Sequence, residues 1–159
     1  MGYSTDFSGQ FNVTPTLSDK DCDFLVKFAQ TRRMARKFKD NIYGIQGEFY
    51  VDGEGDSVKS NDVTVIDYNM PPKTQPGLWC QWIPNDDGTA IVWDEGEKFY
   101  GYIEWIQYLI KSILIPRGYT LNGEVKWFGE DSYDRGKILV KNNVVRIFEG
   151  KIGYKEVVQ

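Results

Sequence analysis

Three groups of residues have the types and spacing that could do chemistry or bind a partner. The first is a basic run from Thr31 to Lys37 that contains Arg32, Arg33 and Arg36. If the run is helical, Arg32 and Arg36 lie one turn apart, where both guanidinium groups can hold one phosphate or carboxylate. The alternative is a solvated helix end, where positive charge suits the helix dipole.

The second group is aromatic and comprises Tyr68, Trp79, Trp82 and Trp93. Strand alternation predicts that Trp79 and Trp82 point to opposite faces, so one lies in the core and the other can face outward. Exposed Trp and Tyr side chains favour interfaces or base stacking. The alternative is a sheet with both faces covered, or a dimer contact.

The third group is polar and lies near the end of the chain. Asn122 and Glu124 are expected on one face of a strand, a spacing that suits ligand hydrogen bonds or a carboxylate base. The following loop carries Glu130, Asp131 and Asp134, whose oxygens could hold a hard cation. Because this loop lacks the Gly and the closing Glu of an EF-hand, we interpret it as a plain hairpin loop and predict no metal.

Composition limits the chemistry further. The chain has 159 residues, which fits a single domain over residues 1–159. Its 19 Lys and Arg against 23 Asp and Glu give a net charge of −4, which argues against a general nucleic-acid binder. The chain contains no histidine, so imidazole acid–base chemistry and histidine metal sites are excluded. It contains no Walker or dinucleotide-binding motif, and no cofactor is predicted.

The cysteines and the apolar segments indicate the cellular compartment of the protein. Cys22 and Cys80 each lie among apolar residues, and we interpret both as buried free thiols. The start of the sequence does not resemble a signal peptide. The most apolar segment, Ile103 to Ile115, is interrupted by polar residues and is too short to span a bilayer. We therefore expect a cytoplasmic protein with no membrane partner.

The first half of the chain predicts one strand, one helix and then several strands. Ser18 is placed as a helix N-cap, and an apolar stripe behind it predicts a helix that runs to about Lys37. A Gly- and Asp-rich loop is expected at Asp52 to Asp56. The strands are expected at Phe7 to Val13, Gly47 to Val51, Val63 to Tyr68, Leu78 to Ile83 and Thr89 to Trp93, the last two forming a hairpin.

The second half predicts a helix and three strands. Apolar residues recur at spacings of three and four from Phe99 to Ile113, and Pro116 ends this helix. Tyr119 to Phe128 alternates as a strand. A turn at Asn142-Asn143 predicts a final hairpin. That hairpin pairs Val140 with Val145 and Ile138 with Ile147, and we expect all four on one buried face.

This order of elements predicts the α+β class, with an antiparallel sheet and two helices packed on one face. A ferredoxin-like core with extra hairpins is one specific version.

Several phrases of the sequence resemble a family of small uncharacterised bacterial and phage proteins. The phrases are Thr31-Arg32-Arg33-Met34, Gly77-Leu78-Trp79-Cys80-Gln81-Trp82, Trp93-Asp94 with Glu97-Lys98-Phe99-Tyr100, and Leu121-Asn122-Gly123-Glu124-Val125, continuing through Gly129-Glu130-Asp131 to Asp134. The resemblance covers most of the chain. It implies no particular activity, although a regulator or inhibitor is plausible for proteins of this type.

Two functions follow as hypotheses. The leading one is a non-catalytic binding protein, whose aromatic sheet surface and arginine run contact a protein partner or a small anionic ligand; a homo-oligomer is compatible with it. The alternative is a small enzyme or ligand-sequestering protein acting on a nucleotide-like molecule. In that case Asn122, Glu124 and Asp131 form the polar centre, and Arg32 or Arg36 holds a phosphate. A convergent pocket favours the alternative, whereas a flat patch favours the leading hypothesis.

Overall fold

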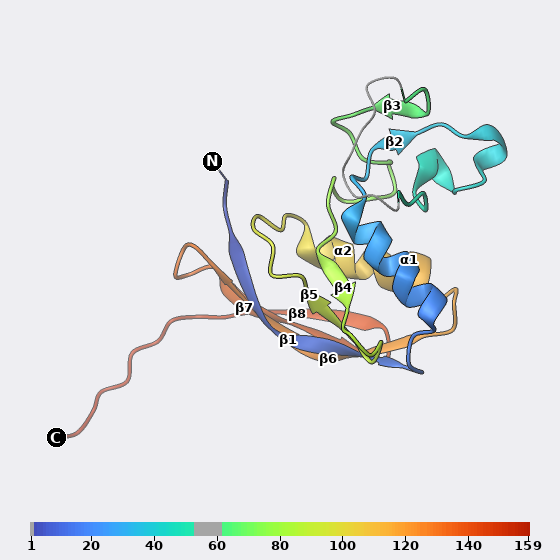
Figure 1. Cartoon of the computed structure of the whole chain (residues 1–159). Coiled ribbons are helices and arrows are strands. Elements are labelled where there is room, and N and C mark those ends of the chain that lie inside the picture. Colours follow the sequence, from blue (N-terminus) through green and yellow to red (C-terminus); the bar gives the residue numbers. More distant parts are fainter. Residues whose placement is uncertain (1, 53–61) are drawn as a thin grey trace.

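A six-stranded antiparallel sheet forms the base of the molecule. The computed structural model describes residues 2–52 and 62–159. The strands lie in the order β4-β5-β1-β6-β7-β8. Their bounds are β1 Thr5–Thr14, β4 Trp82–Pro84, β5 Ala90–Trp93, β6 Thr120–Gly129, β7 Arg135–Lys141 and β8 Val144–Glu149. The predicted α+β class is confirmed, because both helices cover the same face of this sheet (Figure 1).

The helices connect strands that are not neighbours. Helix α1 (Asp19–Gln30) follows β1, and α2 (Tyr102–Leu109) follows β5 and continues into a π-helical turn, η3 (Ile110–Leu114). The connectivity β1-α1-β4-β5-α2-β6, with the neighbours β4-β5-β1-β6, is that of a ferredoxin-like core. The predicted ferredoxin-like version is therefore confirmed, and the β7–β8 hairpin extends the sheet beyond β6.

Apolar alternation explains which face the helices cover. Phe11 and Val13 of β1 and Leu121 and Val125 of β6 are buried, whereas their neighbours in sequence are more exposed. Helix α1 begins as predicted, because the Ser18 hydroxyl oxygen accepts a hydrogen bond from the backbone N–H of Asp21 (3.1 Å). Its buried side chains, with those of α2 and η3, complete one continuous core.

The last hairpin forms in the predicted register. Asn142 and Asn143 have φ values of 47° and 69°, as a tight turn of this kind requires. Ile138 pairs with Ile147 and Val140 pairs with Val145. The expectation that all four are buried is wrong for the two residues of β8, because β8 is the edge strand of the sheet: Ile147 is 39% exposed and Val145 is only partly buried.

Helix α1 ends at Gln30 rather than near Lys37, so the predicted helical placement of the arginines is wrong. Thr31 has extended backbone angles, and its hydroxyl donates to the carbonyl oxygen of Lys27 (2.7 Å) and contacts that of Asp52 (3.2 Å). The chain then continues extended into β2 (Ala35–Arg36), which pairs with β3 (Val65–Asp67).

We call residues 31–81 the insertion, because they lie between α1 and β4. Figure 1 shows β2 and β3 beyond the ends of the helices, on the side away from the sheet. Two short 3-10 turns follow β2, η1 (Lys39–Asn41) and η2 (Ile45–Gly47). The predicted strand at Gly47 to Val51 is wrong, because η2 ends at Gly47 and the chain after it is irregular. The strand predicted at Val63 to Tyr68 is present as the shorter β3. The predicted loop at Asp52 to Asp56 lies outside the described residues from position 53 onward.

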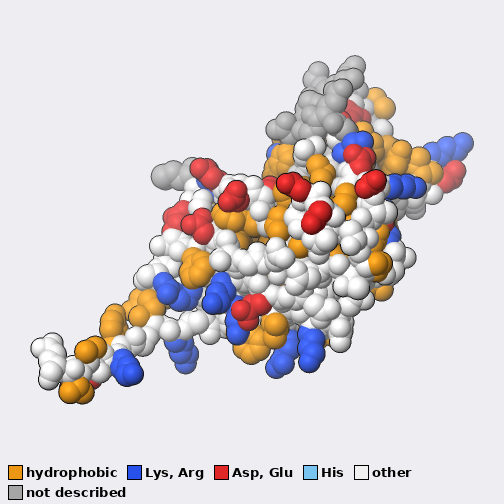
Figure 2. Space-filling model, turned by 60° about the horizontal axis from the view of Figure 1, so that its bottom comes forward, with side chains coloured by type: hydrophobic (Ala, Val, Ile, Leu, Met, Phe, Trp, Pro, Cys, Tyr) orange, Lys and Arg blue, Asp and Glu red, His pale blue; other side chains and the backbone are white. Residues whose placement is uncertain are grey.

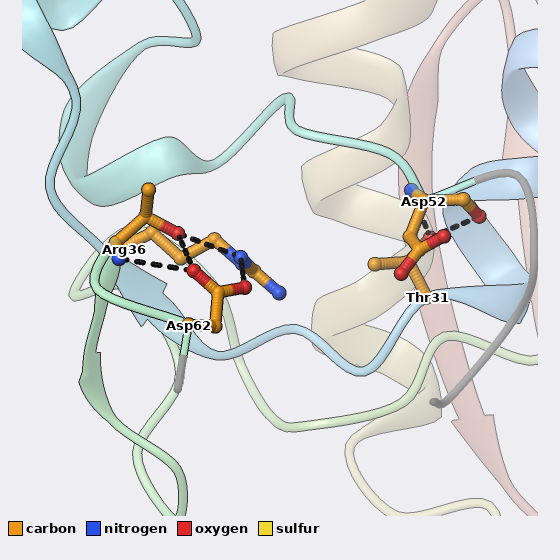
Figure 3. A network of polar contacts seen from close by, with 5 residues as sticks. Thr31, Arg36, Asp52 and Asp62 are labelled. Atoms are coloured by element: carbon orange, nitrogen blue, oxygen red, sulfur yellow. Dashed lines mark hydrogen bonds and ion pairs between the residues drawn. The ribbon is translucent and has the colours of Figure 1, made fainter. Parts of the chain in front are cut away.

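Polar contacts hold the insertion together (Figure 3). The backbone N–H of Asp52 donates to the hydroxyl oxygen of Thr31 (2.8 Å). Arg36 forms an ion pair with Asp62 (2.8 Å). Hydrogen bonds from Thr64, together with the guanidinium of Arg36, lower the pKa of Asp62 to about 2. Because these contacts join residues of the insertion to one another, they stabilise its fold.

Candidate functional site

The three arginines of the basic run are held inside the insertion, each against an aromatic ring. The Arg32 guanidinium lies 4.0 Å from the ring centre of Tyr68, and that of Arg36 lies 4.3 Å from the ring centre of Tyr50. Arg33 lies 4.1 Å from the ring centre of Phe28. Arg33 and Arg36 are buried, and desolvation lowers the pKa of Arg33 to about 10. The run therefore does not present a pair of guanidinium groups one helical turn apart.

The aromatic group is divided between the core and the surface. Trp82 is buried and Trp93 partly buried, and both rings contact Phe7. The strand predicted from Leu78 to Ile83 begins only at Trp82, so Trp79 lies in irregular chain before β4 and the predicted alternation of Trp79 and Trp82 within one strand is wrong. Trp82 is core, and Trp79 is partly buried. Tyr68 lies in the insertion, next to Arg32.

The polar group is divided in a similar way. Asn122 and Glu124 share one face of β6, as predicted, and this is the face that the helices leave open. The Asn122 side chain accepts a hydrogen bond from the backbone N–H of Asn142 (2.8 Å), and Glu124 pairs with Lys137 (3.1 Å). Asp131 lies in the exposed loop after β6, where its carboxylate accepts from the backbone N–H of Tyr133 (2.9 Å). The structure does not bring these residues together with the arginines.

A cavity of about 500 Å³ lies elsewhere, lined by two segments of the chain, residues 77–81 and 97–100. We call it the motif pocket. Its residues are Gly77, Leu78, Trp79 and Gln81 from one phrase and Glu97, Lys98 and Tyr100 from another. Its volume is in the range of small-molecule sites, and apolar surface dominates its lining.

Hydrogen bonds of Gln81 join the two walls of the motif pocket. Gln81 Nε2 donates to the carbonyl oxygen of Glu97 (2.8 Å), and the indole N–H of Trp93 donates to Gln81 Oε1 (3.3 Å). The backbone N–H of Asp94 donates to the carbonyl oxygen of Gln81 (3.0 Å). The irregular chain before β4 is thereby fixed to the loop between β5 and α2, and the pocket is formed before any ligand arrives.

Two aromatic rings of the motif pocket have no ring partner among the described residues. Core rings around Phe7 and Phe99 pack edge to face on one another at 5.0–5.8 Å. Trp79 and Tyr100 do not belong to that network, and Tyr100 is 57% exposed. The Tyr100 hydroxyl accepts a hydrogen bond from the backbone N–H of Tyr3 (3.0 Å). An exposed ring without a ring partner can stack on a flat apolar group.

Two charged side chains, Glu97 and Lys98, also line the motif pocket. Lys98 has a φ of 58°, in the left-handed region that L residues seldom adopt. Among the described residues, no carboxylate lies within ion-pair distance of its ammonium group. Glu97 is exposed beside it. The pocket can therefore offer one unpaired cation to an anionic group.

A buried donor lies behind Gly77. The indole N–H of Trp105 is fully buried and has no hydrogen-bond partner among the described residues. A Cβ placed on Gly77 would lie 3.7 Å from this nitrogen. Leaving a buried donor unpaired costs free energy, but Trp105 does not line the motif pocket, so this N–H is not a contact for a ligand there.

Sequence reasoning named Trp79 but did not select Gln81, Lys98 or Tyr100 as site residues. All three lie in the quoted phrases, so a signal was present in the sequence. What the sequence could not show is that the phrases at 77–82 and 97–100 meet in one cavity.

A second cavity, of about 700 Å³, lies between the insertion and α2. Its floor is a hydrogen-bond network: Tyr108 Oη donates to Glu48 Oε1 (2.8 Å), and Gln75 Nε2 donates to Tyr108 Oη (3.0 Å). Arg33 donates to the backbone carbonyl oxygen of Glu48 (2.9 Å). Since these groups bond to one another, we interpret the network as the structural joint between insertion and core.

Acidic side chains near Asp131 have structural roles. Glu130 accepts from the backbone N–H of Ser4, and Asp134 accepts from Tyr3 and Trp127. No group of three metal-ligating side chains occurs in residues 2–52 and 62–159. Cys22 and Cys80 are free thiols, and Cys22 is only partly buried.

The fold and site together define a ferredoxin-like α+β protein with an inserted lobe and a preformed aromatic pocket. Comparison with protein-family models, with curated proteins and with solved structures found no match. In the part of the chain that the structure describes, no helix is long and apolar enough to cross a membrane.

Proposed function

We propose that this protein is a non-catalytic binding protein, and that the motif pocket takes a small molecule with a flat ring and an anionic group. One observation carries the proposal: a single cavity is lined by two aromatic side chains, Trp79 and Tyr100, together with Lys98. Trp79 and Tyr100 offer ring faces, and Lys98 offers a cation to the anionic group. A nucleotide has this combination of ring and charge.

Binding is favoured over catalysis because the side-chain amide of Gln81, a polar group of the pocket, is already used in hydrogen bonds that hold the pocket walls together. Both ends of the Gln81 amide are occupied by wall contacts. The lining contains no serine, threonine or cysteine. A regulatory role for such a protein in a bacterium or phage, in the cytoplasm, belongs to the same proposal.

The test is calorimetric titration of the purified protein with AMP, with adenosine and inorganic phosphate as probes of each half of the ligand. We expect AMP to bind more tightly than either half. Trp79→Ala and Lys98→Ala should each weaken AMP binding about ten-fold or more, which corresponds to about 1.4 kcal/mol. Tyr133→Ala and Lys39→Ala, at exposed positions outside the pocket, are matched controls.

Gly77→Ala separates pocket filling from loss of folding. Its φ is ordinary and the nearest atom to the new Cβ is 3.7 Å away, so the fold should accept the methyl group. The methyl group narrows the pocket, so AMP affinity should fall while the melting temperature stays unchanged. Absence of AMP binding to the wild type, with no small molecule retained in native mass spectrometry, contradicts the proposal.

A further inference from the structure

The face of the sheet that the helices leave open is strongly basic at one end. Register and alternation place eleven side chains of β6, β7 and β8 on this face: residues 122, 124, 126 and 128, then 135, 137, 139 and 141, then 144, 146 and 148. Five of the eleven are Lys or Arg, and Glu124 is the one acid. The five cations are Lys126, Arg135, Lys137, Lys141 and Arg146. In a chain of net charge −4, this end of the sheet is therefore locally positive.

Figure 2 shows a row of Lys and Arg side chains along the lower edge of this view, with hydrophobic side chains among them, and a group of acidic side chains higher in the same view. The net charge of −4, which argued against general nucleic-acid binding, is the sum over both regions. The distribution of charge, rather than its sum, decides what this face attracts.

Two phenylalanines stand among the cations. Phe128 on β6 is 42% exposed, and Phe148 on β8 is 38% exposed. Both line a hollow of about 230 Å³ with Lys126, Arg135 and Lys137. Since neighbouring strands are about 4.8 Å apart, the two strands that carry the rings are roughly 10 Å apart. The Lys137 ammonium and the Arg146 guanidinium lie 5.3 and 5.4 Å from the ring centre of Phe148.

Exposed rings between cations suit a chain that carries both phosphates and free ring faces. We propose that this basic face, defined by the five cations with Phe128 and Phe148, binds single-stranded nucleic acid. Phosphates contact the lysines and arginines, and bases stack on the two rings. A duplex hides its base faces, and so cannot use the rings. A second copy of the same face is opposed by like charge.

An acidic protein surface would use the cations but not the rings, so the experiment separates the two. Fluorescence anisotropy with a labelled 12-nucleotide single strand is compared with the same sequence as a duplex, and poly-glutamate is added as a competitor. We expect the single strand to bind more tightly than the duplex, and poly-glutamate to compete weakly. With about four phosphates contacted, the slope of log affinity against log salt should be about −3.

Variants test the two kinds of contact. Phe128→Leu and Phe148→Leu keep apolar bulk and remove the rings, and each should weaken single-strand binding about five-fold or more. Lys126→Glu with Arg146→Glu should abolish it. Lys73→Glu with Lys111→Glu, which reverses two lysines outside this face, is the matched control and should leave it unchanged. Circular dichroism confirms that each variant is folded.

Three outcomes overturn the proposal. The first is no binding of the single strand at 50 mM salt, and the second is equal binding of duplex and single strand. The third is strong competition by poly-glutamate together with an unchanged single-strand affinity in the Phe128→Leu and Phe148→Leu variants. The last outcome assigns the face to an acidic protein instead. None of them bears on the motif pocket, whose test uses AMP and different residues.

Discussion

At the scale of single residues, the arginines show how a sequence motif can be structural. The run from Arg32 to Arg36 is attractive as an anion site because three guanidinium groups occur within five positions. In the structure each of them lies over a ring, and Arg33 is further held by the carbonyl oxygen of Glu48. Arginine packs on aromatic faces more readily than lysine does. Two of the three rings, Tyr50 and Tyr68, come from more distant parts of the chain, which local patterns do not reveal.

Tyr108 offers a stability test of the joint between insertion and core. Its phenol donates to Glu48 and accepts from Gln75, and burial raises its pKa well above the ordinary value. Tyr108→Phe leaves both partners short of one hydrogen bond, and should lower the free energy of unfolding by about 1–2 kcal/mol. Urea denaturation measures the change. Tyr133→Phe, at a position that is 71% exposed, should have no effect; equal loss in both variants would contradict the structural role of the network.

At the scale of elements, the helices and the last hairpin could be predicted from the sequence, whereas the fold of the insertion could not. Ser18, the stripe of α2 and the Asn142-Asn143 turn act through neighbours a few residues away, so local patterns predict them. The end of α1 depends on Thr31 and its contact with Asp52, 21 residues further on. Local periodicity contains no information about such a contact, which is why the predicted helix was too long.

The candidate site was predictable only in part, for the same reason. Trp79 was singled out as an aromatic residue, but its alternation relative to Trp82 does not apply, because Trp79 lies outside β4. Its meeting with Tyr100 depends on Gln81 bridging to the carbonyl oxygen of Glu97, 16 positions away. The open face was missed because Phe128 and Phe148 approach each other only through the register of three strands.

Close packing of β1 against β6 makes a glycine indispensable. Gly123 has a φ of 152°, and a Cβ there would lie 2.4 Å from the carbonyl oxygen of Gln10 and 2.9 Å from the Cα of Phe11. Both are backbone atoms that cannot move aside without disturbing the central strand. Gly123→Ala should therefore lower the free energy of unfolding by roughly 1–3 kcal/mol. Thermal denaturation beside Gly77→Ala measures this, and equal melting temperatures of the two variants would contradict it.

At the scale of the whole molecule, Cys80 reports whether the insertion and the sheet unfold together. Its thiol is 1% exposed, and burial raises its pKa to about 12, whereas Cys22 is partly buried. In a Cys22→Ser variant at pH 8, we expect a thiol reagent to modify Cys80 only through unfolding, because the native thiol is neutral and covered. The dependence of the labelling rate on urea gives the surface that must open.

If the labelling rate of Cys80 depends on urea as steeply as global unfolding does, the result supports the single domain expected from the length of the chain. A much smaller slope shows that the insertion opens by itself, and contradicts that expectation. Rapid labelling in the absence of urea would mean that Cys80 is not covered in solution.

The position of β1 has a consequence for how the chain reaches its fold during synthesis. This strand lies in the interior of the sheet, and its two partners are β5 and β6. Translation at about 5–20 residues per second delays the second partner by roughly 5–20 s after β1 leaves the ribosome. Phe11 and Val13, fully sheltered at the end, are exposed during that interval. Folding of this protein therefore waits on its last third, and a nascent chain stalled before β6 is a natural substrate for chaperones.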